Sequence, residues 1–139
     1  MNEIKLSNGV LMPQMGYGVY QIEPEDCERC EMAAISVGYR MIDTAQAYLN
    51  EEAVGKAWKK IGVRREDLFL VNKVWHSNYG EGQTMKSIDE SLRKLQTDYV
   101  DLMLLHQPFC DRSGAYRDLE KAYMAGKVRA IGVSNFFPD

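Results

Sequence analysis

The chain has 139 residues, of which 17 are basic and 20 acidic, and its formal net charge is −3. Apolar residues make up 45% and charged residues 27%, as in an ordinary globular protein. The weak acidity argues against a nucleic-acid partner, and no apolar run reaches the roughly 20 residues of a membrane-spanning helix. Three cysteines offer no even disulfide framework, so we expect a cytoplasmic protein.

The first predicted element is a β-hairpin over residues 4–12. Short apolar segments flank Asn8 and Gly9, and this dipeptide favours a two-residue type I′ turn. The hairpin precedes the repeating part of the chain, so we expect residues 1–14 to form an added cover.

Five apolar runs and four segments with helical spacing follow the hairpin. The predicted strands span residues 15–21, 39–44, 68–75, 99–106 and 127–134. The apolar stripes of the predicted helices are Cys27, Cys30, Ala34 and Val37; Ala53, Val54, Ala57, Trp58 and Ile61; Met85, Ile88, Leu92 and Leu95; and Ala115, Leu119, Ala122 and Tyr123. Gly38, Gly62 and Gly126 follow three of these helices as candidate left-handed caps, and Asn50 is the candidate N-cap of the second.

The alternation of strands and helices predicts a parallel sheet with right-handed crossovers. The predicted strands begin about 28 residues apart, close to the roughly 31 residues per unit of an eight-unit (β/α) barrel. A flavodoxin-like doubly wound domain also contains five strands and four helices. The alternation alone leaves both architectures open.

Four candidate catalytic residues lie at or just after the ends of predicted strands. Asp43 lies at the end of the second run, and Tyr48 follows in the next loop. Lys73 lies near the end of the third run, and His106 closes the fourth. Each residue alone has an ordinary structural interpretation, such as a loop cap or a buried histidine. Because the carboxyl ends of parallel strands meet at one edge, the four together favour a shared site.

These four side-chain types are suited to proton transfer. A tyrosine is a poor acid near neutral pH, and a lysine ammonium beside it stabilises the phenolate. Tyr48 would be the proton donor, and Lys73 and Asp43 would form the pair that tunes it. His106 would orient a substrate oxygen, so the set suits the reduction of a carbonyl group.

Several segments resemble the motifs of the aldo-keto reductase family, and the resemblance extends from the hairpin to the end of the chain. The matching segments are residues 38–45 (GYRMIDTA) with Tyr48, Glu51 and Gly55, residues 73–75 (KVW), residues 104–108 (LLHQP) and residues 126–136 (GKVRAIGVSNF). The resemblance implies a (β/α)8 TIM barrel whose hairpin closes the bottom. It also implies NADPH-dependent reduction of small aldehydes or ketones to alcohols by hydride transfer, with Tyr48 as proton donor.

The same resemblance implies roles for individual residues, and no metal ion. The residues implied in cofactor binding are Gly18, Tyr20, Asp43, Ser134 and Asn135, of which Ser134 and Asn135 would hold the nicotinamide carboxamide. The residues implied in substrate binding are Tyr20, Trp75 and His106. The pattern of glycines at residues 16–20 is no dinucleotide fingerprint, because a third glycine and a following helix are missing.

The family also has three further strands that carry a basic segment for the adenosine 2′-phosphate and an aromatic that stacks on the nicotinamide. We therefore expect residues 1–139 to be a single incomplete barrel domain, with βα units over residues 15–139 and weak or absent turnover alone. The alternative is a catalytically inactive truncated fragment or a self-assembling half-barrel module. Its open sheet edges predict self-association or pairing with a complementing fragment.

Overall fold

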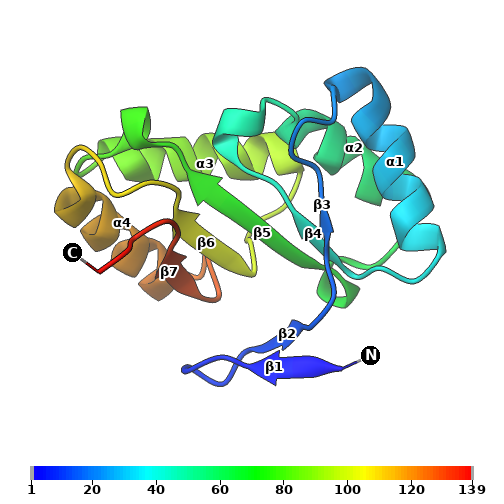
Figure 1. Ribbon diagram of the computed structural model, residues 1–139, viewed down its shortest axis with the longest axis horizontal. Coiled ribbons are helices and arrows are strands. Elements are labelled where there is room, and N and C mark those ends of the chain that lie inside the picture. Colours follow the sequence, from blue (N-terminus) through cyan, green and yellow to red (C-terminus); the bar gives the residue numbers. More distant parts are fainter. Residues whose placement is uncertain (1, 139) are drawn as a thin grey trace.

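The computed structural model describes residues 2–138, which form an N-terminal hairpin, a parallel sheet and four α-helices (Figure 1). The hairpin consists of β1 (Glu3–Lys5) and β2 (Leu11–Pro13). The sheet consists of β3 (Tyr17–Gly18), β4 (Met41–Asp43), β5 (Phe69–Val74), β6 (Leu102–Leu105) and β7 (Ile131–Val133). The helices are α1 (Pro24–Ser36), α2 (Glu51–Ile61), α3 (Gln83–Leu95) and α4 (Arg112–Met124), and the 3₁₀ turns are η1 (Gln46–Tyr48), η2 (Arg65–Asp67) and η3 (His76–Asn78).

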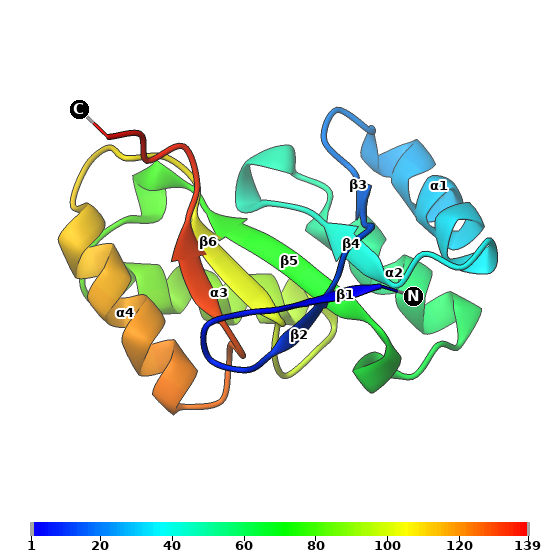
Figure 2. The same ribbon diagram turned by 60° about the horizontal axis from the view of Figure 1, so that its bottom comes forward.

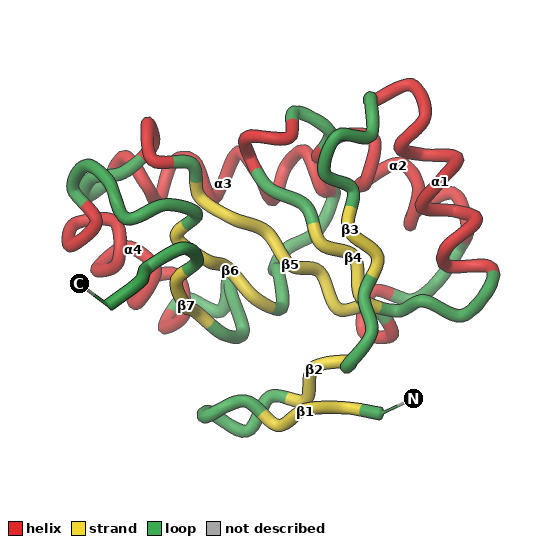
Figure 3. Tube along the Cα trace, viewed as in Figure 1, coloured by secondary structure: helices red, strands yellow, loops and turns green. Residues whose placement is uncertain are grey.

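The strand order decides between the two architectures that the sequence left open. The five parallel strands lie in chain order, β3-β4-β5-β6-β7, and consecutive helices contact one another. The helices lie along one side of the curved sheet (Figures 1 and 3). A doubly wound sheet reverses its strand order and carries helices on both faces. The fold is therefore of the (β/α)8-barrel type, represented here by five strands and four helices.

The hairpin forms as predicted, but its turn differs from the type I′ turn expected at Asn8 and Gly9. Leu6 N donates to Val10 O (2.8 Å) and Gly9 N donates to Leu6 O (2.9 Å), which encloses a three-residue loop. A type I′ turn requires a positive φ at both central residues. Gly9 has a φ of 89°, but the φ of Asn8 is not positive. The hairpin crosses the sheet at the end where the strands begin (Figure 2), and Asn8 Nδ2 donates to Arg129 O (2.9 Å).

The boundaries of α2 follow the sequence signals, with one correction. The helix begins after Asn50 and ends at Gly62, which has a left-handed φ of 77°; the two other predicted glycines also have positive φ. The Asn50 side chain does not cap the helix. It is buried, accepts a hydrogen bond from Thr44 Oγ1 (2.8 Å) and donates one to Val19 O (2.9 Å). Asn50 therefore ties the end of β4 to the segment after β3.

The apolar core lies between the sheet and the helices. Burial of each large aliphatic side chain contributes about 1.5–3 kcal/mol. Two residues of the predicted stripes are exposed: Val37 is 78% exposed just past α1, and Tyr123 is 43% exposed on α4. The largest fully buried apolar side chains include Ile42, Leu70, Ile88, Leu95, Met103, Leu105 and Leu119.

One charged residue occupies the buried stripe of α1. Glu31 lies one turn after Cys27 and is fully buried, and neither carboxylate oxygen has a hydrogen-bond partner. Burial raises the pKa of Glu31 from 4.5 to about 9. The carboxyl group is therefore protonated in the folded protein at neutral pH.

We expect the free energy of unfolding to fall as pH rises from about 4.5 to about 9 because of Glu31. In that window the unfolded chain has lost the Glu31 proton, whereas the folded chain retains it. Glu31→Met has no carboxyl group to titrate, so its free energy of unfolding should not fall in this window. The free energy of unfolding of Glu31→Met minus that of wild type should therefore increase by about 3 kcal/mol between pH 4 and pH 7. Urea unfolding at both pH values measures the difference. The exposed Glu120→Met is the control, and an advantage of Glu31→Met that does not change with pH would contradict the interpretation.

Candidate active site

β5 places Lys73 on the face of the sheet opposite the helices. Successive side chains of a strand point to opposite faces. Asn72 points toward the helices, where its Nδ2 donates to Glu51 Oε2 of α2 (2.9 Å). Lys73 points the other way and contacts Asp43 at the end of the neighbouring strand β4. The side chain of Lys73 is only 9% exposed, so its ammonium depends on protein groups for its partners.

The Lys73 ammonium contacts three oxygens at this edge. Its Nζ donates to Asp43 Oδ1 in an ion pair, to Thr44 O (3.0 Å) and to Tyr48 Oη (3.3 Å). An ammonium group has three N–H donors, and each of them has a partner here. The structure thus brings together three of the four residues singled out in the sequence.

Tyr48 is carried by η1, directly after β4. Leu49 follows with a left-handed φ of 58°, which turns the chain into α2. The Tyr48 ring lies against Tyr20, with ring centroids 5.1 Å apart, and against the edge of His106 at 5.8 Å. The phenol therefore lies among aromatic rings, with its hydroxyl against the lysine.

His106 follows β6 and completes the set of four. Its backbone N donates to Val74 O (3.1 Å), and its ring lies 5.3 Å from the Trp75 ring. Its Nδ1 is buried and has no hydrogen-bond partner. Burial lowers the pKa of His106, and the positive charge of Lys73 acts in the same direction. The imidazole is therefore neutral at neutral pH.

Ser134 and Asn135 follow β7 and lie beside His106. Ser134 N donates to Leu105 O (2.8 Å), which continues the pairing of β7 with β6. Asn135 adopts a left-handed φ of 60°, and its Nδ2 donates to His106 O (2.9 Å) and to Ser134 Oγ (3.2 Å). These contacts place both residues at the same edge of the sheet as the catalytic candidates.

Gly18 and Tyr20 lie on the other side of Asp43. Gly18 pairs with Asp43 in the β3–β4 register, and a Cβ atom added at Gly18 would meet no atom within 4 Å. Tyr20 is 64% exposed. The space at Gly18, beside Asp43, is therefore open.

Three residues that hold the site were missed by the sequence analysis or given another role: Thr44, Gln46 and Asn50. Thr44 supplies the carbonyl for Lys73, and Asn50 fixes the Thr44 side chain. The Gln46 side chain bonds the backbone N of Trp75 (2.9 Å). Local spacing gives no signal for these contacts, because Gln46 and Trp75 are far apart in the sequence. Thr44 lies in a segment that resembles a family motif, and Asn50 was expected to cap α2, but neither observation predicted these contacts.

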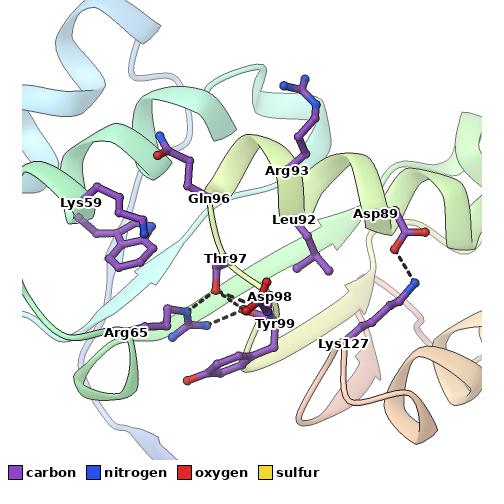
Figure 4. A pocket seen from close by; sticks show the side chains of 11 residues that line it. Lys59, Arg65, Asp89, Leu92, Arg93, Gln96, Thr97, Asp98, Tyr99 and Lys127 are labelled. Atoms are coloured by element: carbon purple, nitrogen blue, oxygen red, sulfur yellow. Dashed lines mark hydrogen bonds and ion pairs between the residues drawn. The ribbon is translucent and has the colours of Figure 1, made fainter.

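A cavity of about 720 Å³ is lined by none of these residues; Figure 4 shows its lining side chains. It lies between α2, α3 and the loop before β6, at the end where the strands begin. Arg65 donates there to Thr97 Oγ1 (2.8 Å), and Lys127 pairs with Asp89 (2.6 Å). Features at this end of a barrel serve stability rather than catalysis. The cavity is therefore a charged surface recess, and the candidate active site is at the opposite end.

Residues 2–138 contain no group of three or more His, Cys, Asp or Glu side chains placed to hold a metal ion. Cys27, Cys30 and Cys110 are free thiols, and the first two lie within α1. No helix in the described part of the chain is long and apolar enough to cross a membrane.

Comparison with known proteins gives the family of this fold and site. Residues 5–139 match the model of the aldo/keto reductase family. The chain belongs to this family. Glyoxal reductase of Bacillus subtilis (strain 168) is 49% identical over 135 residues, covering 96% of this chain and 49% of that protein. Methylglyoxal reductase DkgA of Escherichia coli (strain K12) is 42% identical over 136 residues, covering 96% and 49%.

Solved aldo/keto reductases have the same fold over this region. The enzyme from Brucella melitensis superimposes with a TM-score of 0.94 at 45% identity, covering 98% of this chain and 54% of that one. A Bombyx mori aldo-keto reductase in complex with NADP gives a TM-score of 0.90 at 31% identity, covering 95% and 50%. The chain spans about half the length of the curated relatives it matches.

Proposed function

We propose that this aldo/keto reductase chain acts in the reduction of small aldehydes or ketones to alcohols, with NADPH as the hydride donor. The observation that carries the proposal is the contact of Lys73 Nζ with both Tyr48 Oη (3.3 Å) and the Asp43 carboxylate. A neighbouring ammonium stabilises the phenolate that a phenol leaves on losing its proton. It therefore helps the phenol to protonate a carbonyl oxygen on which negative charge develops. Relatives named as glyoxal and methylglyoxal reductases support small reactive carbonyl compounds as the substrate class.

Tyr48, Lys73 and Asp43 have distinct roles in the proposed proton transfer. The Tyr48 hydroxyl donates its proton to the carbonyl oxygen as negative charge develops there. The Lys73 ammonium stabilises the phenolate that Tyr48 becomes. The Asp43 carboxylate and the Thr44 carbonyl fix that ammonium in place.

His106 orients the carbonyl oxygen in this proposal. Its buried Nδ1 has no hydrogen-bond partner, and buried N–H groups without a partner are rarer in proteins than buried acceptors without one. We therefore assign the proton of the neutral ring to Nε2, which can donate to the substrate oxygen. Trp75 and Tyr20, whose rings lie against His106 and Tyr48, would form the walls of the substrate site.

The residues at the sheet edge fit a nicotinamide cofactor. Ser134 and Asn135 offer a hydroxyl and an amide, the donor and acceptor types that a carboxamide needs. The open space at Gly18, beside Asp43, leaves room for a large ligand. Bound NADPH would supply the hydride that adds to the carbonyl carbon.

An assay of cofactor consumption tests this function. The protein at high concentration is mixed with NADPH and glyoxal or methylglyoxal, and the absorbance of the reduced nicotinamide is followed. We expect a slow, aldehyde-dependent loss of absorbance with formation of the alcohol, detectable at this high protein concentration. Absence of that loss, together with no NADPH binding in a fluorescence titration, would overturn the proposal.

A second candidate function is assembly through the sheet edges. In the described sheet, β3 and β7 each pair with a strand on one side only. We infer that these edges pair with a second copy or a complementing fragment, because open edges readily add strands. Size-exclusion chromatography with light scattering should then give a mass above 15.9 kDa, whereas a stable monomer that unfolds cooperatively would contradict this assembly.

A further inference from the structure

The Gln46 side chain links two segments of the candidate active site. Gln46 opens η1, the turn that ends at Tyr48. Its Oε1 accepts hydrogen bonds from Trp75 N and Asn78 Nδ2, both at 2.9 Å. Trp75 lies just past the end of β5, where the ladder of strand hydrogen bonds has ended. Gln46 therefore supplies the acceptor that holds the Trp75 backbone.

The other end of the amide is anchored on α3. Gln46 Nε2 donates to Ser87 Oγ and Ser91 Oγ, both at 3.1 Å, and lies 3.3 Å from Ser87 O. A primary amide has two acceptor sites and two N–H donors, and all four have partners here. A fully bonded amide between a helix and two loops is held in one orientation. The turn that carries Tyr48 is thus fastened both to α3 and to the Trp75 segment.

Trp75 and Tyr48 both face the His106 ring. The Trp75 and His106 ring centroids are 5.3 Å apart, and those of Tyr48 and His106 are 5.8 Å apart. In the proposed function, a carbonyl group binds where these three rings meet. The placement of Trp75 relative to the Tyr48 hydroxyl then sets the direction in which the carbonyl oxygen points.

We propose that Gln46 is a positioning residue, which fixes Trp75 relative to Tyr48 and so aligns the substrate carbonyl for proton transfer. This inference rests on the proposed function. Loss of the Gln46 bonds leaves the binding groups in place and lets the Trp75 wall shift. A misplacement of about 1 Å can cost about 100-fold in rate. The effect should fall on kcat, because the carbonyl still binds but is poorly aligned with the Tyr48 hydroxyl.

Three variants separate positioning from general stability. Gln46→Met has a similar length and makes none of the bonds, so kcat should fall about 100-fold with little change in KM. Gln46→Glu keeps the acceptor for Trp75 N, and the Ser91 hydroxyl can rotate to donate to its second oxygen. The Ser87 hydroxyl already donates to Thr84 O (2.8 Å). The kcat of Gln46→Glu should therefore be at least about tenfold higher than that of Gln46→Met. Gln83→Met is the matched control, because Gln83 makes one exposed bond to Ser77 O (2.8 Å), and its kcat should equal that of wild type.

A spectroscopic measurement tests the same proposal without turnover. The chain has 2 tryptophans, so 5-fluorotryptophan labelling gives two ¹⁹F signals that Trp75→Phe assigns. Gln46→Met should shift or broaden the Trp75 signal. The signal of Trp58, which is buried and donates to Leu95 O, should not change. An unchanged Trp75 signal, or a changed signal with unchanged kcat, would overturn the proposal. If wild type neither reduces aldehyde nor binds NADPH, the proposed function fails, and the ¹⁹F result alone decides whether Gln46 holds Trp75.

Discussion

Replacement of Tyr48 by phenylalanine is expected to lower the rate of aldehyde reduction by about 10³-fold and to leave the fold intact. The substitution removes the hydroxyl that lies 3.3 Å from Lys73 Nζ and keeps the ring that packs against Tyr20 and His106. The proton donor is lost, whereas the ammonium keeps Asp43 and the Thr44 carbonyl as partners. The rate of NADPH consumption and the thermal unfolding midpoint measure the two effects separately.

Tyr123→Phe is the matched control for this substitution. Tyr123 lies near the end of α4, is 43% exposed, and lines a recess together with Leu6 and Asn8 of the hairpin. It should reduce aldehyde at the wild-type rate. Equal rates for Tyr48→Phe and Tyr123→Phe would remove Tyr48 from the proposed role, and another proton donor would be required.

The largest effect on stability is expected at Asp101, at the end of the sheet opposite the candidate active site. Asp101 is fully buried; its Oδ2 accepts from Arg65 (2.7 Å) and from Leu70 N (2.9 Å), and its Oδ1 accepts from Arg129 (2.8 Å). The side chain of Arg65 is only 12% exposed. Asp101→Ala leaves a guanidinium and a backbone N–H buried without this acceptor, so we expect a loss of about 3–5 kcal/mol in unfolding free energy.

Urea unfolding of Asp101→Ala and Asp98→Ala provides the comparison. Asp98 is an exposed neighbour on the same loop, and its substitution should change the unfolding free energy by about 0.5 kcal/mol or less. The expectation is contradicted if Asp101→Ala lowers the free energy of unfolding no more than Asp98→Ala does. Water would then replace the carboxylate as the acceptor for Arg65 and Arg129.

The sequence predicted the elements that depend on local periodicity. The five parallel strands and four helices form in the predicted order, because apolar spacing and glycine caps act within a few residues. Their lengths were less predictable. The run at residues 15–21 yields only the two residues of β3, because apolar character alone does not determine how many residues find a pairing partner.

Long-range polar contacts were beyond local patterns. Helical spacing places Glu31 on the buried stripe of α1, whereas its charge favours an exposed side chain. Glu31 is buried in the structure, and this outcome depends on tertiary packing that the local pattern does not contain. Asn50 sits at the N-cap position of α2, yet its amide bonds Thr44 and Val19 instead, because buried partners compete with capping. Gln46 has no local signal, since its partners come from the segment after β5 and from α3.

The catalytic candidates were predictable for a different reason. Asp43, Lys73 and His106 each lie at a strand end, and parallel strands in chain order bring those ends to one edge. The contact of Lys73 with Asp43 and Tyr48 therefore follows from strand position rather than from any motif alone.

Transfer of deuterium tests most directly whether this site reduces carbonyl groups. The protein is incubated with methylglyoxal and with NADPH deuterated at both C4 positions, and the product is analysed by mass spectrometry. We predict an alcohol that carries one deuterium on the former carbonyl carbon for each NADPH consumed, and none when NADPH is omitted. Consumption of NADPH without deuterated alcohol, or no consumption at all, would contradict carbonyl reduction at this site.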